Sequence, residues 1–159
     1  MATVRNSITI LAGTIAGFIS LGHSLAFATP VQNQNGDYVG STAIGYTRWE
    51  VVDPDPKGLN CRMAKAFQPA TLDSIDTPRE LYQDHQQPIA SWNVVFSFSP
   101  GERLNAVIGN GRFNQIMLLD AQGKPWLGVR TWKGDCFVRA NSRFVRPLGQ
   151  PGWQNHAGF

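Results

Sequence analysis

Residues 125–138 read Pro-Trp-Leu-Gly-Val-Arg-Thr-Trp-Lys-Gly-Asp-Cys-Phe-Val, and this stretch decides the fold class. Its first eight residues include aromatic and β-branched side chains that favour an extended chain, so they predict a strand over 125–132. Its last three residues predict a second, short strand over 136–138. Another strand is predicted at 113–119, and the loop that follows it contains Gly123, which can adopt a left-handed turn conformation. The stretch therefore predicts antiparallel β-structure.

Further strands are predicted upstream and downstream, each bounded by turn residues. Within 59–63, alternate residues from Leu59 onward are expected to share one face. Within 91–98, the same pattern puts alternate residues from Trp92 to Phe96 on one face. The remaining strands are predicted at 47–52, 103–108 and 143–148.

Residues 64–87 interrupt this strand pattern. Within them, residues 76–83 read Asp-Thr-Pro-Arg-Glu-Leu-Tyr-Gln, in which a capping residue precedes a proline, as is typical of a short helical turn. The turn is too short to be a core helix, so 64–87 is interpreted as a long inserted loop. The short strands and the lack of a long amphipathic helix predict an all-β domain over 46–148, built as a small antiparallel barrel or sandwich.

The N-terminal residues predict export. Arg5 is the only charged residue before Asp37, and a 14-residue apolar run over 8–21 is followed by Ala-Phe-Ala at 26–28. This order is typical of a cleaved signal peptide, here residues 1–28. The alternative, an uncleaved membrane anchor, needs a longer apolar run of about 18–20 residues. We therefore expect a secreted or periplasmic protein without a membrane anchor, with a flexible lead-in at 29–45 and a flexible tail at 149–159.

Charge is unevenly distributed along the chain. The formal net charge is +3 and only 16% of residues are charged, which excludes a disordered polyelectrolyte. Residues 123–159 hold six basic residues and one acidic residue, whereas residues 29–122 carry a net charge of −3. The basic part could receive an anionic ligand, and the alternative is a solvated surface that keeps the protein soluble. Nucleic acid is not expected as a partner, because the protein is predicted to be exported.

Cys61 and Cys136 are the only cysteines in the chain. An oxidising compartment favours a disulfide between them, and two separate buried thiols are the alternative. Two cysteines cannot complete a four-ligand zinc site, and neither His85 nor His156 lies at a ligand spacing from them. No metal and no cofactor is expected.

Four short motifs, spread over residues 47–148, resemble the bacterial SH3-like (SH3b) domain family. They are Gly-Leu-Asn-Cys-Arg at 58–62, the strand and turn 94–104, Gly-Lys-Pro-Trp-Leu-Gly-Val at 123–129, and Cys-Phe-Val at 136–138 followed by Phe144-Val145. The chain is especially similar to small exported SH3-like proteins of cyanobacteria that carry a loop of the Asp-Pro-Asp-Pro type. The resemblance implies a small SH3-like barrel that binds a ligand without catalysis.

The chain departs from the family pattern at several positions. Cys61 stands where valine is usual, and Cys136-Phe137 stands where Gly-Trp is usual. The resemblance places these two positions close together, so it also implies that the two cysteines pair. The usual Ser-Gly-Pro after the arginine is replaced by Met63 and the long insert.

The sequence offers no convincing catalytic group. No Gly-x-Ser-x-Gly motif is present, and His85 and His156 lie in polar segments. Asp53 and Asp55 alternate with prolines, which favours a rigid turn over a calcium or acid–base site. The alternative function is a small secreted hydrolase, or a hydrolase inhibitor, that uses the insert 64–87.

Binding is the function that the residues favour. Trp132, beside Lys133, is the expected exposed platform, whereas Trp92 and Trp126 lie within strands and are weaker candidates. Arg130 and Arg139 supply further positive charge. We expect a monomer whose partner is a cell-wall (peptidoglycan) peptide or glycan, or an envelope protein.

Overall fold

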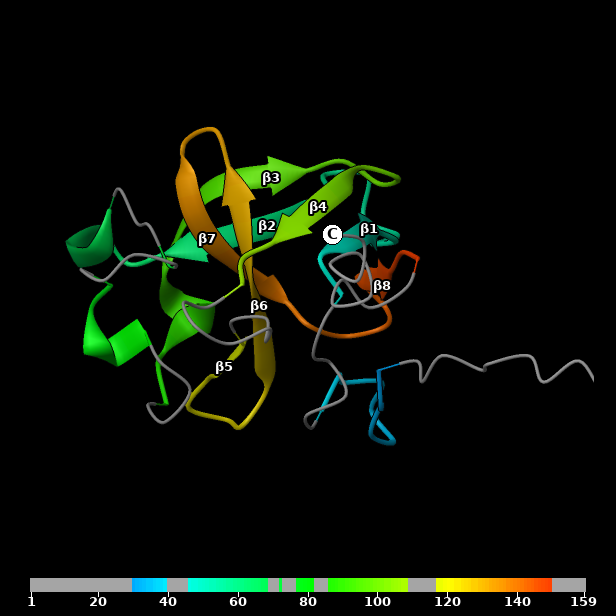
Figure 1. Ribbon diagram of the computed structural model, residues 1–159, viewed down its shortest axis with the longest axis horizontal. Helices are drawn as coiled ribbons and strands as arrows, with labels where there is room; N and C mark the ends of the chain where they lie inside the picture. Colours follow the sequence, from blue (N-terminus) through cyan, green and yellow to red (C-terminus); the bar gives the residue numbers. More distant parts are fainter. Residues whose placement is uncertain are drawn as a thin grey trace, which may run out of the picture.

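The computed structural model describes residues 30–39, 46–68, 72, 77–81, 86–108 and 117–149 (Figure 1). The expected signal peptide and almost all of the expected tail lie outside these residues. The strands are β1 (Arg48–Val51), β2 (Leu59–Met63), β3 (Asn93–Phe98), β4 (Arg103–Ala106), β5 (Met117–Leu119), β6 (Pro125–Thr131), β7 (Gly134–Arg139) and β8 (Val145–Pro147). Between β2 and β3, the described residues include the short 3₁₀ helices η2 (Lys65–Phe67), η3 (Arg79–Leu81) and η4 (Ile89–Ser91). The all-β prediction is confirmed.

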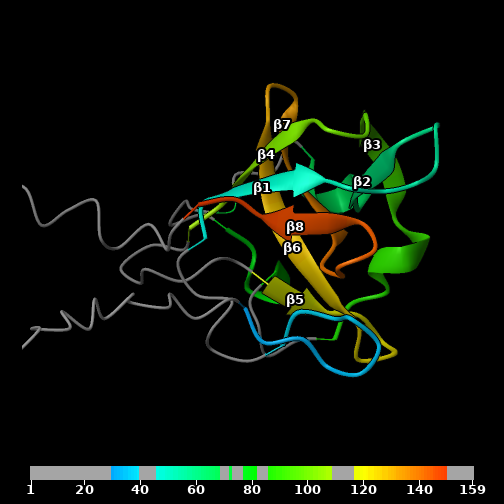
Figure 2. The ribbon, with the colours of Figure 1, turned by 90° about the vertical axis from the view of Figure 1, so that its right-hand side faces the viewer.

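The strands form one antiparallel sheet in the order β3-β2-β7-β6-β4-β1-β8, with β5 paired to β6. β1 and β8 run side by side and cross in front of the long β6, so the sheet curves around its core (Figure 2). The predicted barrel is not closed, because β3 and β8 remain outer strands among the described residues. β8 has only three residues and ends at Pro147, which lacks the N–H needed to extend a ladder.

The core contains most of the aromatic side chains. Trp49 is fully buried, its ring edge meets Tyr38 at 4.9 Å between ring centroids, and its Nε1–H donates to the Tyr46 carbonyl oxygen over 2.9 Å. Trp92 and Trp126 are also buried. The Trp92 ring packs edge-on against Phe67 of the insert and Phe137 of the sheet.

The disulfide between Cys61 and Cys136 is confirmed. Cys61 lies on β2 and Cys136 on β7, which are neighbours in the sheet, and their Cα atoms are 5.6 Å apart. Both residues are fully buried. The bridge therefore links two parts of the chain 75 residues apart, inside the core.

The face prediction holds for β2 but not for β3. Leu59, Cys61 and Met63 are all buried, as alternation requires. β3 pairs with β2 through an irregular register, in which the residues opposite Cys61 and Arg62 are Phe96 and Val94. The intervening residue forms a β-bulge, and Val94 is 46% exposed instead of sharing a buried face.

The structure differs from the expected flexible lead-in over residues 30–39, which pack against the sheet. Tyr38 is buried, and its hydroxyl donates to the Val145 carbonyl oxygen on β8 over 2.9 Å. Its backbone N–H donates to the Ala140 carbonyl oxygen. Both acceptors lie more than 100 residues away in the chain, so local sequence does not reveal this docking.

The described parts of the insert lie beside β2 and β7, away from β1 and β8 (Figure 1). The Leu72 N–H donates to the Asp135 carboxylate over 2.8 Å, and the Phe67 ring meets Trp92 edge-on. Leu81, in the short helical turn, is fully buried. The insert thus completes the core at this end of the sheet.

Candidate functional site

A groove of about 750 Å³ lies between the β1–β2 loop and the β5–β6 turn. We call it the charged groove. Its lining includes the acidic residues Asp53, Asp55 and Asp120, the basic residues Arg62, Lys124, Arg139 and Arg143, and the aromatic residues Trp126 and Phe144. None of the described residues of the insert 64–87 lines it. Both signs of charge are therefore present in one open concavity.

The β1–β2 loop forms a rigid side of the charged groove. The Asp53 carboxylate accepts a hydrogen bond from the backbone N–H of Asp55 over 3.0 Å. The Asp55 carboxylate accepts one from the backbone N–H of Lys57 over 2.9 Å. Gly58 ends the loop at φ +81°, and a Cβ there would collide with the Phe98 carbonyl oxygen. These bonds support the interpretation of the Asp-Pro-Asp-Pro stretch as a structural turn. Asp55 remains exposed to solvent.

Asp120 anchors the β5–β6 turn on the other side of the groove. One carboxylate oxygen accepts the backbone N–H groups of Gln122 and Lys124, and the other accepts the Trp126 indole N–H over 3.0 Å. Burial opposes ionisation, but these hydrogen bonds and the charge of Arg139 outweigh it and lower the pKa of Asp120. Asp120 therefore holds Trp126 in place as an ionised acceptor.

Two of the groove arginines are already engaged in the fold. Arg139 donates to the carbonyl oxygen of Pro125 and pairs with the Asp37 carboxylate, both at 2.5 Å. Arg62 donates to the Trp92 carbonyl oxygen over 2.8 Å. Arg139, which sequence reasoning places among the ligand residues, thus reaches the groove but is held by the docked N-terminal segment.

Lys124 and Arg143 are the free cations of the groove. Both are exposed, and within the described residues neither forms an ion pair. The Arg143 guanidinium carbon lies 5.9 Å from the centroid of the Phe144 ring, which limits its freedom. An anionic group entering the groove meets these two side chains first.

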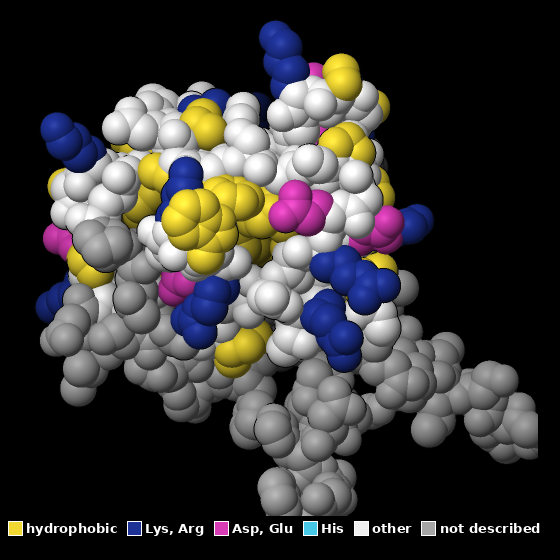
Figure 3. Space-filling model, turned by 90° about the horizontal axis from the view of Figure 1, so that it is seen from above, with side chains coloured by type: hydrophobic (Ala, Val, Ile, Leu, Met, Phe, Trp, Pro, Cys, Tyr) yellow, Lys and Arg dark blue, Asp and Glu magenta, His cyan; other side chains and the backbone are white. Residues whose placement is uncertain are grey.

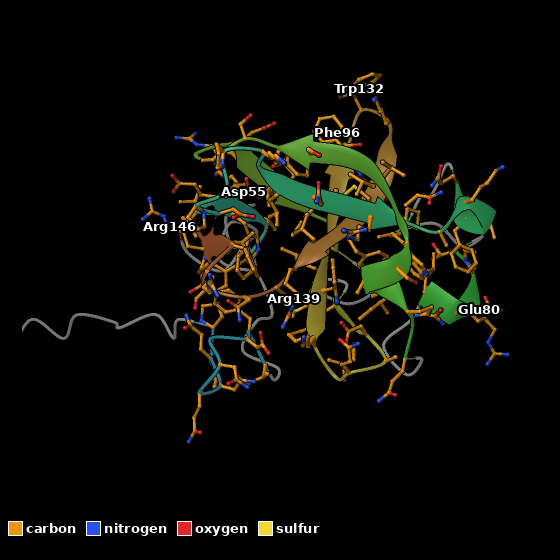
Figure 4. All side chains as sticks on the ribbon, turned by 180° about the vertical axis from the view of Figure 1, so that it is seen from behind. Asp55, Glu80, Phe96, Trp132, Arg139 and Arg146 are labelled. Carbon is orange, nitrogen blue, oxygen red and sulfur yellow. A yellow bond between two sulfur atoms is a disulfide. The ribbon has the colours of Figure 1, made fainter. Side chains whose placement is uncertain are left out.

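The other predicted ligand residues lie elsewhere, at the tip of the β6–β7 hairpin. Trp132 is 82% exposed, as predicted, and the Lys133 Nζ lies 4.9 Å from its ring centroid. Arg130, on the same hairpin, pairs with Asp135 over 3.1 Å. Figure 4 shows Trp132 above Phe96 at one end of the molecule, away from Arg139. Trp92 is buried in the core and reaches neither surface.

Sequence patterns do not single out two of the groove residues as functional. Arg143 stands out only as one of several basic residues near the C-terminus, and Asp120 only as part of a turn. Their roles depend on which faces the curved sheet brings together. His85 and His156 lie outside the described residues.

No described group of three or more His, Cys, Asp or Glu residues is arranged to hold a metal ion. Within the described part of the chain, none of the helices has the length and apolar character needed to cross a membrane. No protein-family model matches the chain, and neither the curated proteins nor the solved structures provide a match.

Proposed function

We propose that the protein is an exported, non-catalytic binding module of the bacterial SH3-like class that binds a peptide of the cell wall in the charged groove. The observation that carries this proposal is the pair of free cations, Lys124 and Arg143, in a groove that also presents the exposed carboxylate of Asp55. A peptidoglycan stem peptide carries carboxylates and an amino group, and so complements both signs of charge.

The chemistry of the groove favours recognition of carboxylates. A guanidinium can donate two parallel hydrogen bonds to one carboxylate, and such charge-assisted bonds are stronger than neutral ones. The Arg143 guanidinium is restrained beside Phe144, so less side-chain entropy is lost when a ligand binds. Lys124, at the β5–β6 turn, offers a second contact for an anion.

The described lining of the groove does not favour hydrolysis by a nucleophile and base pair. Its described lining contains no serine, cysteine or histidine. Asp120 is held ionised by its hydrogen bonds, so it is a poor proton donor near neutral pH. These features support binding over the alternative of hydrolysis.

Sedimentation with purified peptidoglycan at low salt tests the proposal. We expect the protein to pellet with the cell wall, and the double variant Lys124→Ala/Arg143→Ala to bind at least about tenfold more weakly, because two charge-assisted hydrogen bonds are lost. The matched control is Lys65→Ala/Arg79→Ala, which removes two exposed cations of the insert. Equal binding by the two double variants, or protein left in the supernatant at low salt, would contradict the proposal.

A further inference from the structure

β3 is an outer strand with an unused edge. It pairs with β2, and no described backbone group bonds to its other side. In an antiparallel strand, alternate residues direct their N–H and C=O groups away from the existing partner. The outer edge of β3 therefore presents a row of donors and acceptors that another extended chain can use.

The two outer strands of the sheet differ in how they are protected. β8 is short and contains Arg146 and Pro147, features that discourage the addition of another strand. β3 has six residues, Asn-Val-Val-Phe-Ser-Phe, without a charge or a proline. Only the bulge at Val95 interrupts its ladder. Exposed edges of this kind are the docking sites for strand addition.

The surroundings of β3 indicate what kind of chain fits. A shallow hollow at its start is lined by Gln68, Asn93, Val94, Val95 and Lys133, and Lys133 is the only charged residue among these described ones. The Lys133 Nζ lies 5.9 Å from the Phe96 ring centroid and has no ion pair with a described residue. In Figure 3 this face shows an apolar patch at its centre with a basic side chain beside it.

We propose that the outer edge of β3 binds an extended segment of another protein, which adds as a strand and places a carboxylate against Lys133. Apolar side chains of that segment would cover Val94 and Trp132, which are 46% and 82% exposed. A second copy of this chain fits less well, because β3 itself offers no acidic side chain to Lys133. This surface shares no lining residue with the charged groove, so the inference does not rest on the proposed function.

Fluorescence anisotropy with synthetic peptides tests the inference on the full, oxidised chain. The probe is a fluorescein-labelled octapeptide of alternating threonine and valine with one central glutamate, and its companion carries lysine in place of glutamate. We expect the glutamate peptide to bind at least about tenfold more tightly than the lysine peptide. N-methylation of the alternate amides that face β3 should abolish binding, whereas N-methylation of the other amides should not.

Charge-reversal variants identify the site. Lys133→Glu should invert the preference between the two peptides, whereas Lys124→Glu, the matched change in the charged groove, should leave it unchanged. Lys133→Glu should also leave peptidoglycan sedimentation unchanged, which separates this inference from the proposed function. Equal binding of both peptides, or insensitivity to N-methylation, overturns the inference. Sedimentation equilibrium gives a further test. If the wild type is a dimer and Val94→Lys is a monomer, a second copy of the chain covers the edge of β3 and the inference is overturned.

Discussion

At the scale of single residues, Asp120 shows how one buried carboxylate organises one side of the charged groove. It accepts three hydrogen bonds, two from its own turn and one from the Trp126 indole. Three donors around a buried carboxylate favour its ionised form, because a protonated carboxyl accepts these hydrogen bonds less well. The pKa of Asp120 is lowered for this reason, so its contribution depends on pH.

Asp120→Asn should lower the free energy of unfolding at pH 7 by about 2 kcal/mol, because the amide nitrogen cannot accept the hydrogen bonds that one carboxylate oxygen accepts. A carboxyl with a lowered pKa in the folded state stabilises above its unfolded pKa, near 3.8, and loses this effect as the pH falls through the folded value. Urea unfolding at pH 7 and pH 3 should show the difference between wild type and variant shrinking in acid. A constant difference would contradict this assignment.

At the scale of elements, the segment 30–39 does more than lead into the domain. The Asp37 carboxylate accepts hydrogen bonds from the Arg139 guanidinium and from the Asn141 side-chain amide, at 2.5 and 2.6 Å. Tyr38 fills the core beside Trp49. The segment thereby holds Arg139, a residue of the charged groove, in place and links residues 37 and 38 to β7 and β8.

Tyr38→Phe tests this docking. Loss of the hydrogen bond to Val145 should lower the free energy of unfolding at pH 7 by about 1 kcal/mol. Burial raises the pKa of Tyr38 from 10.0 to about 12. A group with a raised folded pKa stabilises below its unfolded pKa and loses that effect as the pH rises from about 10 to about 12. Phenylalanine does not ionise, so the wild type's advantage should shrink between these pH values.

Urea unfolding at pH 7 and pH 11 measures both effects. The control variant is Tyr46→Phe, which changes another buried tyrosine and leaves the hydroxyl of Tyr38 in place. An unchanged free energy of unfolding for Tyr38→Phe at both pH values would show that residues 30–39 do not dock on the sheet in solution.

At the scale of the whole molecule, the open curved sheet depends on contacts between distant parts of the chain. β2 is held to β7 by the backbone pairing of Arg62 with Phe137 and by the disulfide, and this junction connects the paired strands β2 and β3 to β7. The junction therefore determines whether the edge of β3 is presented on a rigid surface.

Cys61→Ala/Cys136→Ala should lower the free energy of unfolding by about 4 kcal/mol, the model-dependent loop-entropy value for a loop of this length. The urea midpoint of the wild type should fall on reduction with dithiothreitol, whereas that of the double variant should not. Thiol labelling of the unfolded protein confirms reduction. A fully reduced wild type with an unchanged midpoint would contradict a stabilising role for the bridge.

The sequence by itself determined the all-β class and the positions of most strands, because alternation and turn residues are local features. It favoured an exposed Trp132, which the structure places at the tip of the β6–β7 hairpin. It also favoured the pairing of Cys61 with Cys136. Only the tertiary structure decided that the sheet stays open, that the bulge in β3 turns Val94 outward, and that Tyr38 is buried. The tertiary structure also places Trp132 outside the charged groove and brings Lys124 and Arg143 into its lining. These outcomes depend on sheet order and curvature, which place residues together according to long-range pairing and not according to their spacing in the chain.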